Sequence, residues 1–330
     1  MAQRILIIGT GLIGASIGLA LKSLNQPETK ILGWDANPSE LSTAIAIDAI
    51  DGPLPSRDTA LAPNIADIYV LATPVLPIMD WMQLLAPALN EHQLITDVGS
   101  TKSEIATLAA TLFNQPGRAR FLPGHPMAGK ESGGAALASA NLFAGATWLF
   151  TPIDPSPSPL EQQWRKLIQS IGAHIRDLSP EQHDEVCAWV SHLPQYLSTA
   201  LAALLQDKFS ADHEGMAAVQ AIGGRALRET TRLGSSPYSM WRDIALTNTS
   251  AIAETLSALE QRLAHLRENL RTPELREEFA TANKFRAKPD NPANTSEHAP
   301  QTDPTHKLSS RPERSAVERP AASWSNPQTK

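Results

Sequence analysis

The amino-acid sequence predicts a doubly wound α/β domain followed by a largely helical domain, and three observations support this fold class. Short apolar runs alternate with helix-like segments over the first half of the chain, which is typical of a parallel sheet covered by helices. After a proline-rich segment, apolar residues recur mainly at helical spacing. A chain of 330 residues is also long enough for two domains that each bury a core.

The elements of the first domain follow from its apolar runs. "RILIIG" ends at glycine and "LIGASIGLALKSL" has helical spacing, so together they predict a strand, a tight turn and a helix. "KILGWD", "IYVLATPV" and "QLITDVGS" predict further strands, while "PIMDWMQLLAPAL" and "SEIATLAATLF" predict helices. We expect "ATWLFTP" to be the last strand of this sheet.

A proline-rich segment marks the expected domain boundary. "TPIDPSPSP", residues 151–159, has almost no large apolar side chains. We therefore expect the α/β domain at residues 1–155 and the helical domain at 156–288. Residues 289–330 are mostly Pro, Ser, Thr, Asn and charged residues, which cannot bury enough apolar surface to offset their ordering entropy, so we expect a disordered tail.

The second domain should contain one short strand, "AHIRDL", and several helices. A long helix is expected to begin after Ser179, which can serve as N-cap, with Pro180 in the first turn and Gln182 completing a capping box. Pro194 should kink this helix, because it removes the donor to the carbonyl of Val190. "SMWRDIALTNTSAIAETLSALEQRLAHLRENL" and "ELREEFATANKF" predict two further helices.

Composition excludes some classes of partner. The formal charge of −6 and the lack of a dense Lys/Arg run make a nucleic-acid surface unexpected, so small molecules are the expected partners. No apolar run approaches the roughly 20 residues that span a bilayer. The single Cys187 cannot form an internal disulfide and the N-terminus lacks a signal-peptide core, so we expect a cytoplasmic protein.

The hexapeptide "GTGLIG" predicts a dinucleotide-binding turn. Gly9 would allow the tight turn, Gly11 the approach of a pyrophosphate, and Gly14 close packing of helix on strand. Asp35 ends the next strand, where a carboxylate can accept both ribose hydroxyls and repel a 2′-phosphate, which favours NAD over NADP. The alternatives are a structural turn without ligand and a surface carboxylate. The expected cofactor contacts include the residues between the glycines, Leu12 and Ile13.

Two further turns should lie at the same edge of the sheet, because ligands of open α/β sheets bind outside the carboxyl ends of the strands. One contains Thr73 and Pro74, and the other runs from Asp97 to Ser100. For Thr73, Asp97 and Lys102, capping of turns and helices is an equally good interpretation.

Polar side chains farther along the chain are ambiguous by themselves. His125 lies between glycine and proline in an expected loop, and His192 lies on the long helix, where a core or surface histidine is the commoner case. Arg232 and Arg242, with Trp241, suit either salt bridges at the surface or a carboxylate clamp.

Five motifs in order nevertheless resemble one family. "DVGSTK", "GHPMAGKESGG", "SHLP" and "TRLGSSPYSMWRDI", after the N-terminal GxGxxG, are similar to the prephenate/arogenate dehydrogenases over about residues 4–285. The resemblance implies a Rossmann domain followed by an all-α dimerisation domain of the 6-phosphogluconate dehydrogenase C-terminal type. It also implies a homodimer formed through that domain, no metal, and NAD(P)-dependent oxidative decarboxylation in tyrosine biosynthesis, with prephenate as the expected substrate and arogenate as the alternative.

The resemblance also implies roles for individual residues. His125 would deprotonate the ring hydroxyl of the substrate as hydride leaves the same carbon, and Ser100 would assist there. Arg232 would hold a substrate carboxylate, His192 would lie by the side chain, and Trp241 would line the pocket.

The chain departs from the family pattern at several positions. Arg225 and Ala226 stand where glycines are common, and Glu229 stands where aspartate is common. Lys130 replaces a small hydroxyl residue, and Gln195 replaces a frequent histidine, so either could alter substrate choice. Two other functions stay open: a hydroxyacid or sugar-acid dehydrogenase, which would typically use a lysine base that the long helix lacks before Lys208, and an NAD-binding sensor without catalysis.

Overall fold

The computed structural model describes residues 3–62, 64–130 and 132–287. The expected disordered tail at 289–330 lies outside these residues. No helix in the described part of the chain combines the length and apolar character needed to cross a membrane.

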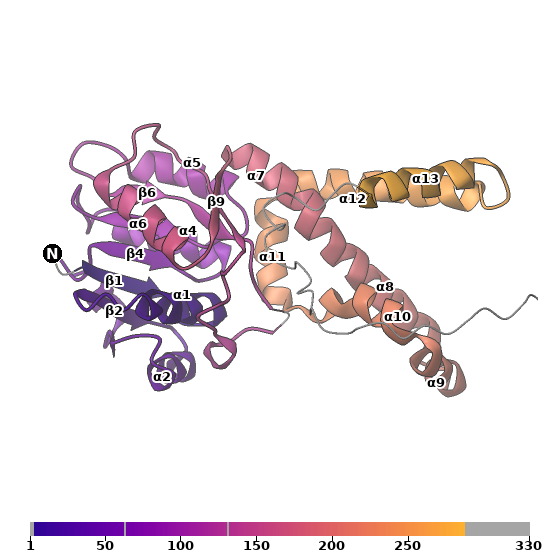
Figure 1. The fold of residues 1–330 in the computed structure, drawn as a ribbon, viewed down its shortest axis with the longest axis horizontal. Helices are drawn as coiled ribbons and strands as arrows, with labels where there is room; N and C mark the ends of the chain where they lie inside the picture. Colours follow the sequence, from indigo (N-terminus) through magenta and orange to yellow (C-terminus); the bar gives the residue numbers. More distant parts are fainter. Residues whose placement is uncertain (1–2, 63, 131, 288–330) are drawn as a thin grey trace, which may run out of the picture. The chain divides into compact units, whose positions relative to one another are not determined.

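A six-stranded parallel sheet forms the centre of the first domain, in the order β3-β2-β1-β4-β5-β6 (Figure 1). This is the predicted doubly wound order, with a switch point between β1 and β4. The strands are β1 (Gln3–Ile8), β2 (Thr29–Trp34), β3 (Gly52–Pro53), β4 (Ile68–Leu71), β5 (Leu94–Asp97) and β6 (Arg120–Leu122).

Helices cover both faces of this sheet and divide the core in two. Ile5 and Ile7 of β1 pack into one cluster with helices α1 (Leu12–Ser23) and α2 (Pro38–Ala46). Leu6 and Ile8 pack into the other, with α4 (Val75–Leu85) and α5 (Ser103–Leu112). Alternate side chains of a strand point to opposite faces, so β1 is buried on both. A short helix, α3 (Arg57–Ala60), follows β3.

One strand assignment was wrong. "ATWLFTP" does form a strand, β8 (Thr147–Phe150), but β8 belongs to a separate sheet with order β7-β8-β9. It pairs antiparallel with β7 (Gly124–Pro126) and parallel with β9 (His174–Asp177), the predicted short strand. Apolar pattern indicates an extended segment but not its pairing partner.

The predicted domain boundary also differs from the structure. Helix α6 (Pro159–Ser170) buries Trp164 and Ile168 in the same core cluster as β1, and β9 pairs with β8. Residues 156–177, which we assigned to the helical domain, therefore pack with the α/β domain. The proline-rich segment is a loop within this domain, and one turn of 3₁₀ helix, Ala135–Leu137, lies earlier in it.

The helical part begins at the predicted capping box: the Ser179 hydroxyl accepts from the backbone N–H of Gln182, at the start of α7 (Pro180–Cys187). The long helix is interrupted by a π-helical turn, Ala188–His192, directly before α8 (Leu193–Phe209). The expected kink at Pro194 is thus a wide turn, a common accommodation where a helical hydrogen bond is missing.

Helices α9 (His213–Ile222) and α10 (Gly224–Thr231) and a 3₁₀ turn, Arg232–Ser235, were not predicted. The next predicted helix is divided at Asn248 into α11 (Tyr238–Thr247) and α12 (Thr249–Glu268), and α13 (Glu274–Arg286) follows as predicted.

The two domains are in contact through α4 with α11 and α5 with α7. A 2.7 Å hydrogen bond between the hydroxyls of Thr101 and Thr247 joins them.

Candidate active site

The predicted glycine turn joins β1 to α1. Gly9 has a φ of +95°, which favours glycine, and a Cβ there would lie 2.5 Å from the carbonyl oxygen of Ala72. A Cβ on Gly14 would lie 1.9 Å from the carbonyl oxygen of Gly9, so only glycine lets the helix pack this close. Among residues 3–62, 64–130 and 132–287, no atom outside the neighbouring turn lies within 4 Å of a Cβ placed on Gly11. Gly9 and Gly14 are therefore packed closely against the backbone, whereas the space beside Gly11, at the centre of the turn, is open.

The open centre suits an anion. Gly11 is the N-cap of α1 and supplies no side-chain cap to the first backbone N–H groups, and Leu12 and Ile13 begin the helix without an acidic residue. Free N–H groups and the positive end of the helix dipole bind phosphates at such positions. These residues fit the pyrophosphate of NAD.

Asp35 follows β2 and is anchored beside this turn. Its carboxylate accepts from the backbone N–H of Thr10 at 2.6 Å and of Asn37 at 2.8 Å. The carboxylate is thus held beside the glycine turn.

Thr73 and Pro74 follow β4 at the same edge of the sheet. A Cβ on Gly9 would lie 2.9 Å from Cγ2 of Thr73, so this turn borders the glycine turn. Pro74 is the N-cap of α4, and no side chain caps that helix. The Thr73 hydroxyl therefore does not cap α4, but it donates to the carbonyl of Pro74 at 3.4 Å, which agrees with the alternative of a capped turn.

A buried ion pair braces the turn after β5. Lys102 and Asp97 are both fully buried and joined by a short hydrogen bond. Asp97 also accepts from the backbone N–H of Gly99 at 2.7 Å and of Gly124 at 3.1 Å. Burial lowers the pKa of Lys102, against the opposing effect of Asp97. The pair holds the turn that carries Ser100 against strand β7.

His125 lies in strand β7 rather than in the expected loop, opposite Leu149 of β8. Its side chain is 8% exposed. Nδ1 lies 2.9 Å from Nε2 of His183 on α7, and Nε2 forms no hydrogen bond with a described residue. No hydrogen bond joins His125 to Ser100 in the described part of the chain.

His183 was missed as a partner of His125, and its environment is built from two domains. Its Nδ1 lies 2.8 Å from Oδ1 of Asp184. That carboxylate accepts from the backbone N–H groups of Lys102 at 2.7 Å and Ser103 at 2.8 Å, at the start of α5. The dipeptide His183-Asp184 was the signal available in the sequence, but it does not reveal a partner 58 residues away.

Burial controls the protonation of this cluster. It lowers the pKa of His125 well below its usual value, and charge on His183 and Lys102 acts in the same direction. Burial also lowers the pKa of His183, although Asp184 opposes it. Burial alone would raise the pKa of Asp184, but hydrogen bonds from His183 and Ser103 lower it. At neutral pH the cluster is thus two neutral imidazoles and one carboxylate.

Donor atoms of His125, His183 and Cys187 lie within 4.8 Å of one another, a set whose chemistry would suit zinc. Two of these groups already hydrogen bond to each other. Burial raises the pKa of the Cys187 thiol to about 12, so it stays protonated. The arrangement therefore fits a hydrogen-bond network better than a metal site.

The predicted substrate residues His192 and Trp241 lie together, with ring centroids 5.8 Å apart. His192 is fully buried, its Nδ1 lies 3.5 Å from the side-chain amide of Asn248, and its Nε2 has no hydrogen-bond partner among the described residues. Nε1 of Trp241 is likewise buried and has no hydrogen-bond partner in the described part of the chain. Burial lowers the pKa of His192 to about 4. Unpaired buried polar atoms are costly unless a ligand or water satisfies them.

Arg232 is exposed at the start of the 3₁₀ turn Arg232–Ser235. Gln195 of α8 holds this turn: its amide donates to the carbonyl of Leu233 at 2.7 Å and accepts from the hydroxyl of Ser236 at 3.1 Å. Gln195, which replaces the histidine frequent in the family, therefore holds the segment that carries Arg232 in place.

The other departures lie at the surface. Arg225 and Glu229 pair with each other across one turn of α10 at 2.5 Å, an exposed ion pair worth about 0.3–0.5 kcal/mol. Ala226 is exposed on the same helix. Lys130 donates to the carbonyl of Leu137 at 2.6 Å. These contacts explain how the residues are accommodated without assigning them to a ligand.

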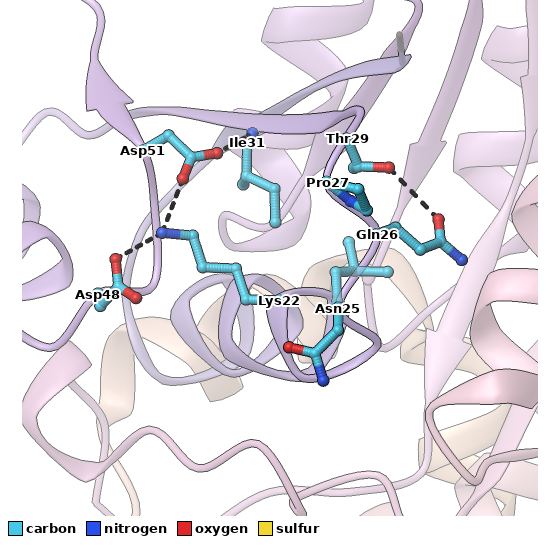
Figure 2. Close-up of a pocket in the computed structure, with 9 residues that line it drawn as sticks. Lys22, Asn25, Gln26, Pro27, Thr29, Ile31, Asp48 and Asp51 are labelled. Atoms are coloured by element: carbon cyan, nitrogen blue, oxygen red, sulfur yellow. Dashed lines mark hydrogen bonds and ion pairs between the residues drawn. The ribbon is translucent and has the colours of Figure 1, made fainter. Parts of the chain in front are cut away.

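A surface depression of about 470 Å³ lies elsewhere, between the end of α1 and the start of β2 (Figure 2). Lys22 pairs there with Asp48 at 2.6 Å and with Asp51 at 2.8 Å. This is the amino end of the strands, opposite the glycine turn, and its one ammonium group is paired with two carboxylates. It is not the candidate active site.

Comparison with known families matches both domains. Residues 17–177 match the nucleotide-binding domain of prephenate dehydrogenase, and residues 179–284 match the prephenate dehydrogenase dimerization domain. The prephenate dehydrogenase of Bacillus subtilis is 35% identical over 77% of this chain and 66% of its own length. That of Lactococcus lactis is 34% identical over 79% of this chain and 69% of its own length. This chain thus spans about two thirds of those relatives.

Solved structures agree. Prephenate dehydrogenase from Aquifex aeolicus, in complex with hydroxyphenyl propionate and NAD+, has a TM-score of 0.77 and 28% identity, covering 88% of this chain and 99% of that one. Arogenate dehydrogenase from Synechocystis has a TM-score of 0.67 and 28% identity, covering 86% and 98%. With a glycine turn that fits NAD and both domains matched, this chain belongs to the prephenate dehydrogenase family of NAD-dependent oxidoreductases.

Proposed function

We propose that the protein oxidises prephenate with NAD+ to give 4-hydroxyphenylpyruvate, carbon dioxide and NADH. The observation that carries this proposal is the buried His125: its Nδ1 is engaged by His183, while Nε2 forms no hydrogen bond with a described residue. A neutral imidazole with one nitrogen available can accept a proton. Asp97, at the carboxyl edge of the sheet, hydrogen bonds to Gly124 of β7. This contact supports a location of His125 beside the cofactor.

The reaction needs removal of one proton and one hydride. Gly9, Gly11 and Gly14 would hold NAD+ at the glycine turn, where it would supply the acceptor for the hydride of the ring carbon that bears the hydroxyl. His125 takes the hydroxyl proton through Nε2 as this carbon becomes a carbonyl, and Ser100 assists at the same oxygen. The bond to the ring carboxylate then breaks, its electron pair makes the ring aromatic, and the phenolate oxygen regains the proton from His125.

Substrate binding is assigned to the helical domain. Arg232 would hold a carboxylate through its planar guanidinium, and the half-buried Trp241 and the buried His192 would line the pocket. For the cofactor, Gly9, Gly11 and Gly14 would contact the pyrophosphate with Leu12 and Ile13, Thr73 and Pro74 would border the nicotinamide, and Asp35 would bind the ribose. Its negative charge supports a preference for NAD over NADP.

The decisive test measures NADH formation with His125→Asn and with His174→Asn, a control at an exposed histidine of β9. Loss of the base should lower kcat by about 10²–10⁴-fold, with NAD+ affinity nearly unchanged. The control should behave as the wild type. Unchanged turnover of His125→Asn would remove it from the catalytic role.

Arogenate is the second candidate substrate, and the likeness to the Synechocystis arogenate dehydrogenase supports testing it. It carries an amino group in place of the keto group of the side chain. Wild-type enzyme should be assayed with both compounds side by side. A higher kcat/KM with prephenate is expected; a higher value with arogenate would reverse the assignment, and no oxidation of either would contradict it.

We further propose a homodimer formed through the helical domain. Helices α9, α10 and α13 bury no residue within the chain. Exposed large apolar side chains are concentrated from Val186 onward. Such surfaces are typical of protein interfaces.

The single cysteine supports a cytoplasmic location.

A further inference from the structure

We propose that His183 and Asp184 form a proton-sharing pair that sets the tautomer of His125 and stabilises it when it is protonated. This inference rests on the proposed role of His125 as base. It concerns positioning residues, because neither His183 nor Asp184 is required to touch the substrate.

The hydrogen-bond chain determines where each proton lies. The carboxylate of Asp184 receives backbone N–H donors at both oxygens and has a lowered pKa, so it is ionised and only accepts. His183 must then carry its proton on Nδ1, the nitrogen 2.8 Å from Asp184. This leaves a lone pair on Nε2 of His183.

The same logic extends to His125. Because Nε2 of His183 is an acceptor, Nδ1 of His125 must be the donor across the 2.9 Å contact. The lone pair of neutral His125 therefore lies on Nε2, the nitrogen that forms no hydrogen bond with a described residue. This is the tautomer that a base acting through Nε2 requires. The opposite tautomer would present an N–H to the substrate hydroxyl.

The His183–Asp184 pair also lowers the free-energy cost of protonating the buried imidazole of His125. His125 has a strongly lowered pKa because of burial, so its cation is unfavourable in isolation. When Nε2 takes the substrate proton, the proton on Nδ1 can shift toward Nε2 of His183, which places positive charge next to the carboxylate of Asp184. No proton is lost: it returns to Nδ1 when the phenolate recovers its proton from Nε2.

The carboxylate at the end of this chain is held rigidly. Asp184 caps the start of α5 through the backbone of Lys102 and Ser103, and its own carbonyl accepts from the side chain of Asn248 at 2.9 Å. Contacts to α5 and to the start of α12 fix the pair between the two domains. The catalytic base in β7 is therefore oriented by residues of α7.

One experiment reads the tautomer without activity. Two-bond ¹H–¹⁵N correlation spectra of imidazole-labelled protein, at mildly alkaline pH, distinguish neutral Nδ1–H from Nε2–H histidines, and the missing signal in His125→Asn assigns His125. We expect His125 as the Nδ1–H form in the wild type, and loss of this preference in His183→Leu. A neutral Nε2–H form in the wild type overturns the proposal.

Kinetics test the same pair. His183→Leu should lower kcat about 10–100-fold, a part of what a lost base costs, with KM for prephenate and NAD+ within about twofold. His183→Gln keeps an acceptor for Nδ1 of His125 and should recover part of kcat. Thr255→Val, which removes a buried polar group of α12 whose hydroxyl donates to the carbonyl of Ile252, is the matched control and should stay near wild type.

These outcomes separate the two proposals. Equal losses in His183→Leu and Thr255→Val, or a rise of KM with kcat unchanged, would indicate a merely structural role and overturn the pair. If the wild type oxidises neither prephenate nor arogenate, the proposed function fails while the tautomer spectrum still decides the assignment of His183.

Discussion

At the scale of residues, the candidate site depends on histidines kept neutral by burial. His125, His183 and His192 all have a lowered pKa, and for His192 the value falls from 6.5 to about 4. The unfolded chain binds protons at these positions at a higher pH than the folded protein does. Protonation therefore favours unfolding in this range.

This difference predicts acid sensitivity. As pH falls from 6.5 toward 4, the unfolded state takes up more protons, so the free energy of unfolding should fall with pH. His192 alone accounts for about 3 kcal/mol across this window, since one pKa unit corresponds to about 1.4 kcal/mol. Urea unfolding at several pH values measures this slope.

The matched comparison uses His192→Asn and His174→Asn. Removing the buried imidazole should flatten the slope between the two pKa values, whereas removing the exposed one of β9 should leave it unchanged. A stability that stays constant or rises as pH falls through this window would contradict the assignment.

At the scale of elements, the glycine turn separates folding from ligand binding. A Cβ on Gly14 would lie 1.9 Å from a backbone oxygen, whereas one on Gly11 would meet nothing within 4 Å. Gly14→Ala should therefore lower the melting temperature, since the backbone must shift to accept the methyl group. Gly11→Ala should fold normally and bind NAD+ more weakly, because its methyl group would occupy the position proposed for the pyrophosphate.

Calorimetric melting and NAD+ titration of both variants check this. Equal NAD+ affinity of Gly11→Ala and wild type would remove the pyrophosphate from the centre of the turn. An unchanged melting temperature of Gly14→Ala would show that the close packing is not limiting.

Sequence motifs predicted helices and strands correctly where all the residues of the motif lie within a few positions of one another. The capping box at Ser179 formed as expected because its partners lie three residues apart. The strand Thr147–Phe150 was recognised but given the wrong sheet, since pairing depends on distant segments. The wide turn at Ala188–His192 was expected only as a kink: Pro194 shows that a hydrogen bond is missing, but not how the helix accommodates it.

At the scale of the whole molecule, the exposed apolar surface of the helical part predicts assembly. Leu204 of α8 and Ile222 of α9 are 66% and 83% exposed. Light scattering should give twice the chain mass of 35.6 kDa for the wild type. Leu204→Asp/Ile222→Asp should shift the mass toward the monomer, because a carboxylate would be buried in the interface.

The control is Ile45→Asp on α2, where an exposed apolar residue lies in the α/β domain. It should keep the mass of the wild type. A monomeric wild type would contradict the dimer, and a dimeric double variant would exclude these two positions from its interface.

The sequence by itself determined the alternation of strands and helices in the first domain, the glycine turn and, through the family motifs, the candidate residues His125, His192 and Trp241, because periodicity and motif spacing are local properties of the chain. Tertiary structure decided the rest. It moved residues 156–177 into the α/β domain by burying α6 on the sheet, and it paired His125 with His183 across 58 positions. Packing of distant segments creates such contacts, and no local pattern specifies them.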